Sequence, residues 1–283
     1  MPEPQVCIVI LNWNGKEWLQ KCIPSLKKTR YRNYKVIVAD NGSADGSQAY
    51  VKRQGIDLVA LDRNYGFAGG NNRGTEYALK KYVCEYVLLL NNDIEVIQPE
   101  WLKIIVETAE RRNAGIVGCK LLLPDGRIQH AGGYFHPVRI AAHRGVLKKD
   151  DGQYDDEKEM DYVTGAAFMI SRSLIEKIGL LDENYFPIYF EEADYCRKAK
   201  QAGFAVVYTG KAKLVHHTSA TTSREQEDKR YYIWEKNRMR FVQRNFPLLW
   251  KPSAYSRILA GAIFSRAPLQ RLKTLARVWK ELY

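Results

Sequence analysis

Two acidic side chains lie one residue apart after an apolar run, a spacing that could hold a metal ion. Asp93 and Glu95 flank Ile94, and in extended backbone both carboxylates face the same way. Carboxylate oxygens are the ligands that Mg²⁺ and Mn²⁺ prefer, and such a metal could stabilise charge on a leaving diphosphate. His216 could complete the site, although the adjacent His217 leaves open which imidazole faces it. The alternative interpretation is a solvated loop start with a structural histidine.

Three more acids open a predicted helix, at Glu191, Glu192 and Asp194. Acidic side chains favour the first turn of a helix because they interact well with the helix dipole. A carboxylate in this place could also act as a general base and take the proton from an attacking hydroxyl group. The residue types alone favour neither of these two interpretations over the other.

The elements that must position these residues are predicted from the alternation of apolar runs and amphipathic segments over the first 120 residues. Strands are expected at 6–11, 35–39, 56–61, 86–90 and 114–120, and helices at 17–28, 43–53, 71–81 and 101–112. The pattern indicates βαβ units. It therefore predicts an α/β fold with a mostly parallel central sheet flanked by helices.

Polar clusters follow three of the predicted strands, at 12–14, 40–43 and 91–93. Right-handed crossovers bring the C-terminal ends of parallel strands to one edge of a sheet, where ligands bind. We therefore expect a nucleotide site at this edge.

A glycine-rich segment at 64–72, NYGFAGGNN, is predicted to be a loop over 64–70 that lets backbone approach a ligand. It lacks the GxGxxG spacing of dinucleotide-binding folds and the GxxxxGK[ST] pattern of a P-loop. The sequence therefore argues against a dehydrogenase and against an ATPase.

The pattern changes after residue 120. A hairpin region is expected at 121–144 and a charged, mobile loop at 148–161, and an apolar run follows at 163–171. A late strand is expected at 205–208, and the segment 214–218 carries the two adjacent histidines. The C-terminal residues are predicted to be helical twice, at 229–245 and 269–282.

The cysteine content and the N-terminal sequence indicate the cellular compartment of the protein. Five cysteines, an odd number without a Cys-x-x-Cys pair, favour a reducing compartment over a disulfide framework. The first residues do not resemble a signal peptide, and no apolar run reaches the roughly 18 residues of a membrane span. A cytoplasmic protein is expected.

The basic charge is concentrated near the C-terminus. Of the net charge of +12, residues 1–223 carry +3 and residues 224–283 carry +9, which suggests a nearby anionic surface of lipid or nucleic acid. The apolar stripe from Leu269 to Leu282 has basic residues beside it, as in helices that lie on a membrane. No recognised nucleic-acid motif is present. The alternative is that these helices pack on the body or on another copy of the chain, as in a homodimer.

Seven segments, taken in order, resemble family 2 glycosyltransferases with a GT-A fold. They are VILNWNG at 9–15, VADNGSADGS at 38–47, NYGFAGGNN at 64–72, LLLNNDIEV at 88–96, VTGAAFMISR at 163–172, FEEADYCRKAKQAG at 190–203 and HHTSATTS at 216–223. The resemblance covers roughly residues 5–245, and within the family it points to rhamnosyltransferase-like and galactofuranosyltransferase-like members.

The resemblance implies a role for each matching position. Asp40 would recognise the nucleobase, and Gly165 and Ala166 would border the donor and the acceptor. The nucleotide pocket would be lined or supported by Asn12, Asn14, Asn41, Ser43, Asn64, Phe67, Gly69, Gly70, Asn71, Asn91 and Asn92.

The resemblance also implies the metal ligands and the base. Mn²⁺ or Mg²⁺ would be held by Asp93, Glu95 and His216. Glu192 would be the general base, at a position where relatives often have Asp, with Glu191 as the fallback in the same acidic motif.

The implied activity is inverting transfer of a sugar from a nucleotide-diphosphate donor to a hydroxyl of a saccharide or lipid-linked acceptor, in cell-surface polysaccharide synthesis. dTDP-rhamnose is the first expected donor, and UDP-sugars are the alternatives. A sugar-phosphate nucleotidyltransferase is a rival, but it would carry a basic glycine-rich loop after the first strand, where this chain has only Lys16. A membrane-binding or nucleic-acid-binding protein is the other rival.

The expected organisation is a catalytic domain over 1–223, with a nucleotide half at 1–120 and an acceptor half at 121–223. A basic helical extension would follow at 224–283, and it would allow peripheral contact with the inner face of the cell membrane.

Overall fold

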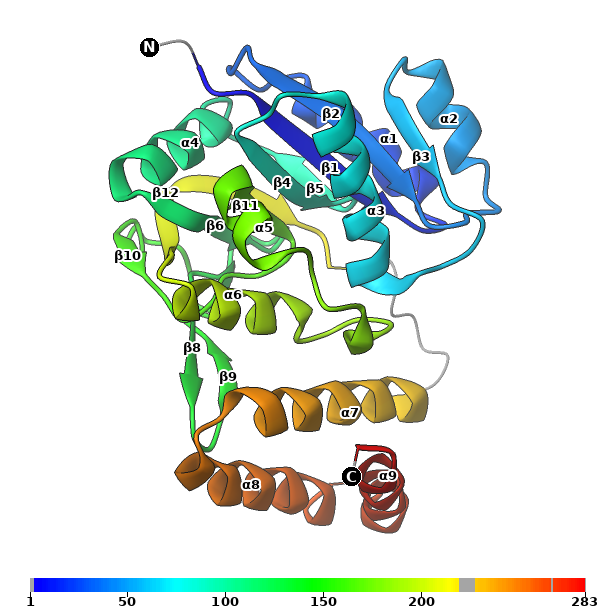
Figure 1. Cartoon of the computed structure of the whole chain (residues 1–283), viewed down its shortest axis with the longest axis vertical. Helices are drawn as coiled ribbons and strands as arrows, with labels where there is room; N and C mark the ends of the chain where they lie inside the picture. The colour runs from blue at the N-terminus through cyan, green and yellow to red at the C-terminus, as the bar shows by residue number, and fades with distance from the viewer. Residues whose placement is uncertain (1–2, 219–226, 266, 283) are drawn as a thin grey trace.

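The computed structural model describes residues 3–218, 227–265 and 267–282 (Figure 1). Four parallel strands form its N-terminal part, in the order β3-β2-β1-β4. Their bounds are β1 (Val6–Asn12), β2 (Tyr34–Asp40), β3 (Asp57–Ala60) and β4 (Tyr86–Asn91). The helices of this part are α1 (Lys16–Leu26), α2 (Ser47–Arg53), α3 (Gly66–Lys81) and α4 (Trp101–Arg112). The predicted α/β alternation is confirmed.

The same sheet continues into the second half of the chain. Its further strands are β5 (Ile94–Val96), β6 (Ala114–Leu122), β7 (Ile128–His130), β10 (Glu157–Glu159), β11 (Ala167–Ser171) and β12 (Ala205–His216). Strand β11 lies antiparallel between β4 and β6, and β12 runs parallel to β6. The division expected at residue 120 therefore falls inside β6, and one sheet spans both halves.

The side chains of β1 alternate between the two faces of the sheet and so contribute to two separate apolar cores. Val6, Ile8 and Ile10 face α1 and α4, whereas Cys7 and Val9 face α3. All five side chains are fully buried, as expected for a strand covered on both faces. The sheet is therefore sandwiched between helical layers, and its strand ends are left to form a site.

Glycines in α3 allow this helix to pack tightly on the sheet. A Cβ atom at Gly74 would lie 2.4 Å from Cγ1 of Val9, and one at Gly70 would lie 2.4 Å from Cδ1 of Leu11. The loop predicted over 64–70 is therefore wrong from Gly66 onward, where the helix already begins. The physical reason is that these glycines permit close packing of helix on sheet, a role that the segment's composition did not distinguish from a ligand loop.

The charged segment at 148–161 is tied to the sheet. Lys120 on β6 is fully buried, and its ammonium group contacts Asp150 at 2.7 Å and also pairs with Asp155. Lys213 on β12 adds contacts of 3.1 Å and 3.2 Å to the same two carboxylates. A mobile loop was expected, but buried lysines need paired carboxylates, and this segment supplies them.

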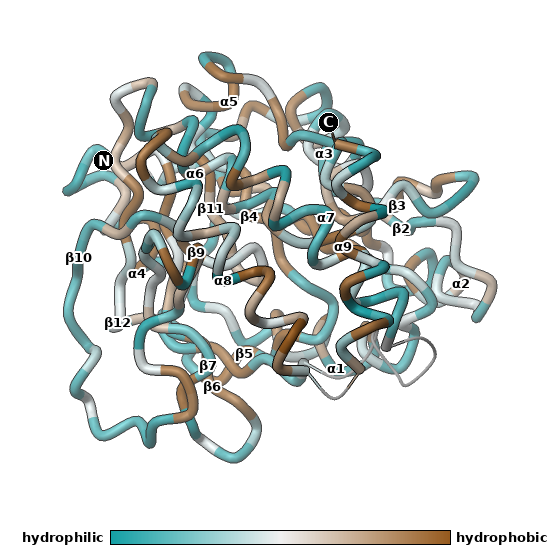
Figure 2. The backbone as a smooth tube through the Cα atoms, turned by 90° about the horizontal axis from the view of Figure 1, so that it is seen from below, coloured by the Kyte–Doolittle hydropathy of each residue, from teal (hydrophilic) through white to brown (hydrophobic). Residues whose placement is uncertain are grey.

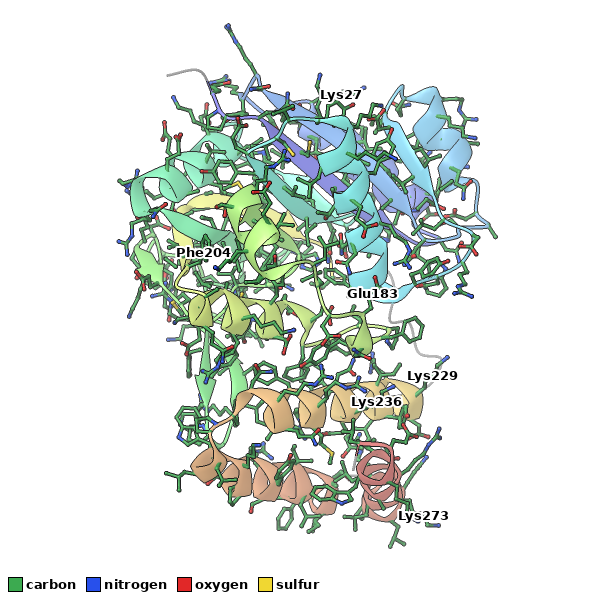
Figure 3. All side chains as sticks on the ribbon, viewed as in Figure 1. Lys27, Glu183, Phe204, Lys229, Lys236 and Lys273 are labelled. Carbon is green, nitrogen blue, oxygen red and sulfur yellow. The ribbon has the colours of Figure 1, made fainter. Side chains whose placement is uncertain are left out.

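The hairpin region is confirmed as β8 (Gly133–His136) paired with β9 (Ile140–His143). The late strand is longer than expected, because β12 continues through an irregular stretch at 209–213 and ends at His216. The helices of this half are α5 (Arg172–Ile178), the short 3₁₀ helix η1 (Glu183–Tyr185) and α6 (Glu191–Gln201). Glu183 bonds Asn72 and Arg73, so η1 is held against α3 (Figure 3).

The described residues from 227 to 282 form three helices, where two were expected: α7 (Glu227–Asn245), α8 (Lys251–Ile263) and α9 (Pro268–Leu282), with the 3₁₀ helix η2 (Leu248–Trp250) before α8. Helix α8 was missed because apolar residues occur on both its buried and its exposed faces, which obscures the helical period. Within the described residues, every helix is too short or too polar to span a bilayer.

Helix α7 belongs to the core that the sheet forms. Asn237 donates to the carbonyl oxygens of Tyr185 at 2.6 Å and Ile188 at 2.8 Å. Phe241 and Val242 are fully buried in the same apolar core as the sheet. The boundary expected at residue 223 lies outside the described residues, but the extension expected to follow it begins with a helix that completes the core.

Candidate active site

Three polar residues end the central strands at one edge of the sheet. Asn12 on β1 is opposite Asp40 on β2, and Leu11 is opposite Asn91 on β4. The structure thus brings the three polar clusters together, as the topology argument requires.

The Asp40 carboxylate is buried and held by several donors. Its Oδ2 accepts a hydrogen bond from Nδ2 of Asn12 at 2.8 Å, and its Oδ1 accepts from the backbone N–H of Ser43 and from Nε2 of Gln48, both at 2.9 Å. Sequence reasoning missed Gln48, although it lies in the helix that directly follows the motif. Oδ2 retains acceptor capacity for a ligand.

Asn12 and Asn14 extend this network across the strand ends. The Nδ2 of Asn92 donates to Oδ1 of Asn12 at 2.7 Å. The backbone N–H of Asn14 donates to Oγ of Ser43, and the Oδ1 of Asn14 accepts from the N–H of Ala44, both at 2.8 Å. Asn14 has a φ of +47°, a conformation that Asn tolerates better than most residues. These side chains connect the segments that follow β1, β2 and β4.

Asn41 shapes the entry into α3. Its Nδ2 donates to Oδ1 of Asn64 at 2.9 Å and to the carbonyl of Gly66 at 3.0 Å, and its Oδ1 accepts from the N–H of Tyr65 at 2.9 Å. The Oδ1 of Asn64 also accepts from the N–H of Gly66 at 2.7 Å. The amide hydrogen bonds of Asn41 are directed to this turn.

The remaining α3 positions face the protein interior. A Cβ atom at Gly69 would lie 2.9 Å from Cβ of Tyr65, so this glycine, like Gly70, is required by packing. Asn71 donates to the carbonyl of Phe67 at 3.0 Å, and its buried Oδ1 has no hydrogen-bond partner among the described residues.

Asp93 and His216 meet where β5 runs antiparallel to β12. Oδ1 of Asp93 lies 3.0 Å from Nε2 of His216, and Nδ2 of Asn91 lies 3.3 Å from the same nitrogen. Oε1 of Gln129 lies 2.8 Å from Nδ1 of His216. Sequence reasoning missed Gln129, for which the hairpin region carries no signal. Of the two adjacent histidines, His216 is the one that faces Asp93.

Glu95 does not join that pair. Its Oε2 lies 3.0 Å from Nε2 of His217, whose ring lies 5.3 Å from the ring of Trp18. Within residues 3–218, 227–265 and 267–282, no three His, Cys, Asp or Glu side chains gather in a group that could hold a metal. The expected three-residue set is therefore reduced to Asp93 and His216, because successive histidines in extended backbone point to opposite sides and His217 takes Glu95.

The two glutamates that open α6 differ in burial. Glu191 is 2% exposed, and its Oε2 has no hydrogen-bond partner in the described part of the chain. Burial, together with the charge of Glu192, raises the pKa of Glu191 well above the usual 4.5. Glu192 is half-buried, and desolvation also raises its pKa.

Gly165 brings Glu192 next to the nucleotide half. A Cβ atom at Gly165 would lie 2.9 Å from Cζ of Phe67 and 3.6 Å from Cβ of Glu192. The adjacent Ala166 is buried, and its carbonyl accepts the N–H of Asn91 at 3.0 Å. A side chain at 165 would enter this junction and displace the ring of Phe67.

Asp194 has interior partners. Its Oδ1 accepts from the hydroxyl of Tyr185 at 3.0 Å and from Nδ2 of Asn245 at 2.7 Å, and its Oδ2 lies 2.7 Å from Nζ of Lys198. These contacts join α6 to η1 and α7, which supports a positioning role for Asp194.

Comparison with known proteins places these features in a family. The family model described as "Glycosyl transferase family 2" matches residues 7–179. An uncharacterised protein of Sinorhizobium fredii is 35% identical over 234 residues, covering 78% of this chain and 25% of that protein. The O-antigen biosynthesis protein RfbC of Myxococcus xanthus is 31% identical, covering 77% and 18%. This chain therefore spans a quarter or less of these two relatives. The N-acetylglucosaminyl-diphospho-decaprenol L-rhamnosyltransferase of Mycobacterium tuberculosis is 25% identical, covering 77% of this chain and 78% of that protein.

Two solved structures share the fold at low identity. The mannosyltransferase of Pyrobaculum calidifontis, in complex with GDP-Man and Mn²⁺, has a TM-score of 0.61 and 15% identity over 99% of this chain and 81% of that chain. GalNAc-T7 with UDP, GalNAc and Mn²⁺ has a TM-score of 0.69 and 15% identity over 99% and 57%. These likenesses confirm the expected GT-A fold. With the match to the family model, they lead to one conclusion: this chain belongs to glycosyl transferase family 2.

Proposed function

We propose that this chain is a metal-dependent inverting glycosyltransferase with Glu192 as its general base. The observation that carries the proposal is the position of Glu192, which is half-buried at the start of α6 and adjoins Gly165 and Phe67. This junction joins the acidic helix to the nucleotide half of the chain. A base must lie beside the bound donor to receive the proton of the attacking hydroxyl.

Burial separates the roles of the two glutamates. Glu191 is enclosed, and its raised pKa favours the protonated, uncharged form. A protonated carboxyl group cannot accept the acceptor proton. Glu192 is the more accessible of the two, and its moderately desolvated carboxylate is a stronger base than a fully hydrated one.

In the proposed reaction the acceptor oxygen attacks the anomeric carbon from the face opposite the leaving group. The bond from that carbon to the nucleoside diphosphate breaks as the new glycosidic bond forms, and Glu192 takes the hydroxyl proton. One displacement inverts the configuration, and no covalent enzyme intermediate forms.

Asp93 and His216 fit a divalent metal, Mn²⁺ or Mg²⁺. Gln129 is placed to accept the Nδ1 proton of His216, which leaves the Nε2 lone pair facing Asp93. A cation would stabilise two acceptor atoms that face each other 3.0 Å apart. When bound, the metal would neutralise charge that develops on the leaving diphosphate. The mannosyltransferase and GalNAc-T7 structures were both solved with Mn²⁺.

The donor and acceptor are proposed from the named relatives. The name of the rhamnosyltransferase supports a rhamnose donor, and dTDP-rhamnose is the first to test, with UDP-sugars next. The same name and that of the O-antigen protein support a saccharide or lipid-linked acceptor in cell-surface polysaccharide synthesis. Asp40 would recognise the nucleobase, through the acceptor capacity left on Oδ2.

A cytoplasmic location is part of the proposal. The five thiols are free and buried, which suits a reducing compartment.

The test is a nucleoside diphosphate release assay on the purified chain with Mn²⁺, after a thermal-shift screen has identified the donor. Glu192→Gln should lower turnover by at least about 100-fold, whereas Glu191→Gln should retain most of it. The opposite pattern would move the base to Glu191. Release of pyrophosphate instead of nucleoside diphosphate would identify a nucleotidyltransferase and overturn the proposal.

Calorimetry tests the metal separately. Asp93→Ala should remove the dependence of donor affinity on Mn²⁺, with Glu95→Ala as the control variant that keeps it. Equal donor affinity with and without Mn²⁺ in the unmodified chain would contradict the metal role.

A further inference from the structure

The apolar stripe of α9, expected to be a lipid-facing surface, is covered in part. Leu275 and Val278 are buried in the apolar core, together with Ile258 of α8. Helix α9 packs on α7 and α8, so part of its stripe serves internal packing. Leu269 of the stripe stays 77% exposed, and further exposed apolar side chains lie on the neighbouring segments.

Those side chains come from η2, α8 and the first turn of α9. Leu248, Leu249, Phe264 and Leu269 are 77% to 89% exposed, and Leu259 and Ile263 are also exposed. We call these six residues the α8 surface. In the view from below, hydrophobic segments are visible along α8 and α9, which face the reader (Figure 2). Exposed apolar patches of this kind mark sites of interaction with a membrane or a protein.

The stretch of sequence that carries the α8 surface has charges of one sign. Residues 246–280 contain seven Lys and Arg and no Asp or Glu. Lys251 starts α8, Arg257 is exposed in its middle, and Lys273 projects from α9 at the lower edge of the molecule (Figure 3). Two carboxylates lie beside α9: Asp228 accepts from Gln270, and Glu281 pairs with Arg277 at 3.0 Å. Apolar side chains with an excess of cations around them are suited to an anionic amphiphile.

The α8 surface lies away from the sheet. Helices α8 and α9 form the lowest layer of the molecule, and α7 lies between them and α6 (Figure 1). A flat partner could therefore contact this layer without displacing any element of the candidate active site.

We propose that the α8 surface docks the protein on an anionic lipid bilayer. The leucines and Phe264 insert among the lipid chains at the level of the headgroups, and the surrounding Lys and Arg contact the anionic headgroups. The inference concerns binding alone and does not depend on the proposed sugar transfer.

A second copy of the chain fits the α8 surface less well than an anionic bilayer does. A symmetric contact through the α8 surface would bring two sets of cations together, with no carboxylate between residues 246 and 280 to neutralise them. The exposed aliphatic side chains also distinguish this surface from the polar and aromatic surfaces that bind nucleic acid.

The test is co-sedimentation of the full chain with vesicles of phosphatidylcholine alone, or of phosphatidylcholine with one third phosphatidylglycerol. The unmodified chain should bind the anionic vesicles at least tenfold more tightly, and added salt should weaken binding. The double variant Leu249→Ser/Phe264→Ser should lose at least tenfold in affinity for anionic vesicles. Val83→Ser is the matched control, because Val83 is 83% exposed between α3 and β4, away from α8, and should bind normally.

Circular dichroism confirms that each variant is folded, and sedimentation velocity reports the oligomeric state. A second pair, Lys251→Gln/Arg257→Gln, should weaken binding to anionic vesicles even if the apolar pair were to misfold. Equal binding to both vesicle types, or no effect of the two charge substitutions, would overturn the proposal. The proposal would also be overturned if the unmodified chain formed a dimer and did not bind vesicles, and if the variants were monomers.

Discussion

At the scale of single residues, the neighbouring carboxyl groups of Glu191 and Glu192 have different surroundings. Glu191 is enclosed at the start of α6 with one oxygen unpartnered among the described residues, whereas Glu192 is half-buried at the junction with Gly165. A buried carboxyl group without a partner is stable only when it is protonated. The burial of Glu191 therefore has a measurable cost that depends on pH.

Glu191→Gln should stabilise the protein increasingly as pH rises. The folded state raises the pKa of Glu191, so unfolding releases a proton at any pH between the usual 4.5 and the raised folded value. Over that range rising pH favours unfolding, by up to about 1.4 kcal/mol per pH unit. Glutamine has the shape of glutamate but does not ionise. The free energy of unfolding of the variant, measured by urea titration, should therefore exceed that of the unmodified chain by an amount that grows between pH 5 and pH 8. Glu110→Gln, an exposed site on α4, is the control, and an equal trend there would contradict the explanation.

At the scale of elements, helix α3 depends on glycine for its distance from the sheet. Gly70 and Gly74 lie on the face that meets β1, where a Cβ atom would clash with Leu11 and Val9 respectively. This distance also fixes Phe67, which α3 presents to Gly165 and hence to the start of α6. Packing of α3 therefore determines the geometry of the site.

Gly74→Ala should destabilise the fold by about 1–3 kcal/mol, because the added Cβ must displace Val9 or move the helix. Gly261→Ala in α8 is the control. Its new Cβ would meet only the flexible end of Arg257, at 3.5 Å. The better helix propensity of Ala should therefore stabilise the folded protein by up to about 1 kcal/mol. Thermal melts of both variants measure the difference. A Gly74→Ala protein as stable as the parent would show that α3 can shift freely.

At the scale of the whole molecule, the part of the chain that holds the candidate active site is completed by α7. Asn237 and Asn245 bond Tyr185, Ile188 and Asp194, so α7 holds both η1 and the start of α6. The apolar face of α7 shares one core with the sheet. Helices α8 and α9 cover the opposite side of α7.

A chain that ends at residue 223 should therefore fail to fold, whereas a chain that ends at 246 should keep a cooperative transition. Each large buried side chain such as Phe241 contributes about 3–5 kcal/mol, and the loss of a whole helix of them exceeds a typical stability of about 5–15 kcal/mol. Differential scanning calorimetry distinguishes the two outcomes. A cooperative transition in the shorter chain would mean that the catalytic part ends before α7.

Much of the fold was predictable, because apolar periodicity reports which faces are buried. Residues 101–112 were predicted as a helix with the bounds that α4 has, and the polar clusters at 12–14, 40–43 and 91–93 were placed at one edge. Helix α8 and the true start of α3 were not predictable in this way. In both, the informative contact is made with a distant segment that no local pattern contains.

The sequence by itself determined the α/β class, the strand-end clusters and the ordered motifs of family 2, because each depends on residue types close together in the chain. Only the tertiary structure decided how neighbouring candidates differ. The antiparallel pairing of β5 with β12 directs His216 to Asp93 and leaves His217 with Glu95. Packing at the start of α6 buries Glu191 and leaves Glu192 at the junction with Gly165. Adjacent residues of the same type are alike in sequence, and only their long-range neighbours tell them apart.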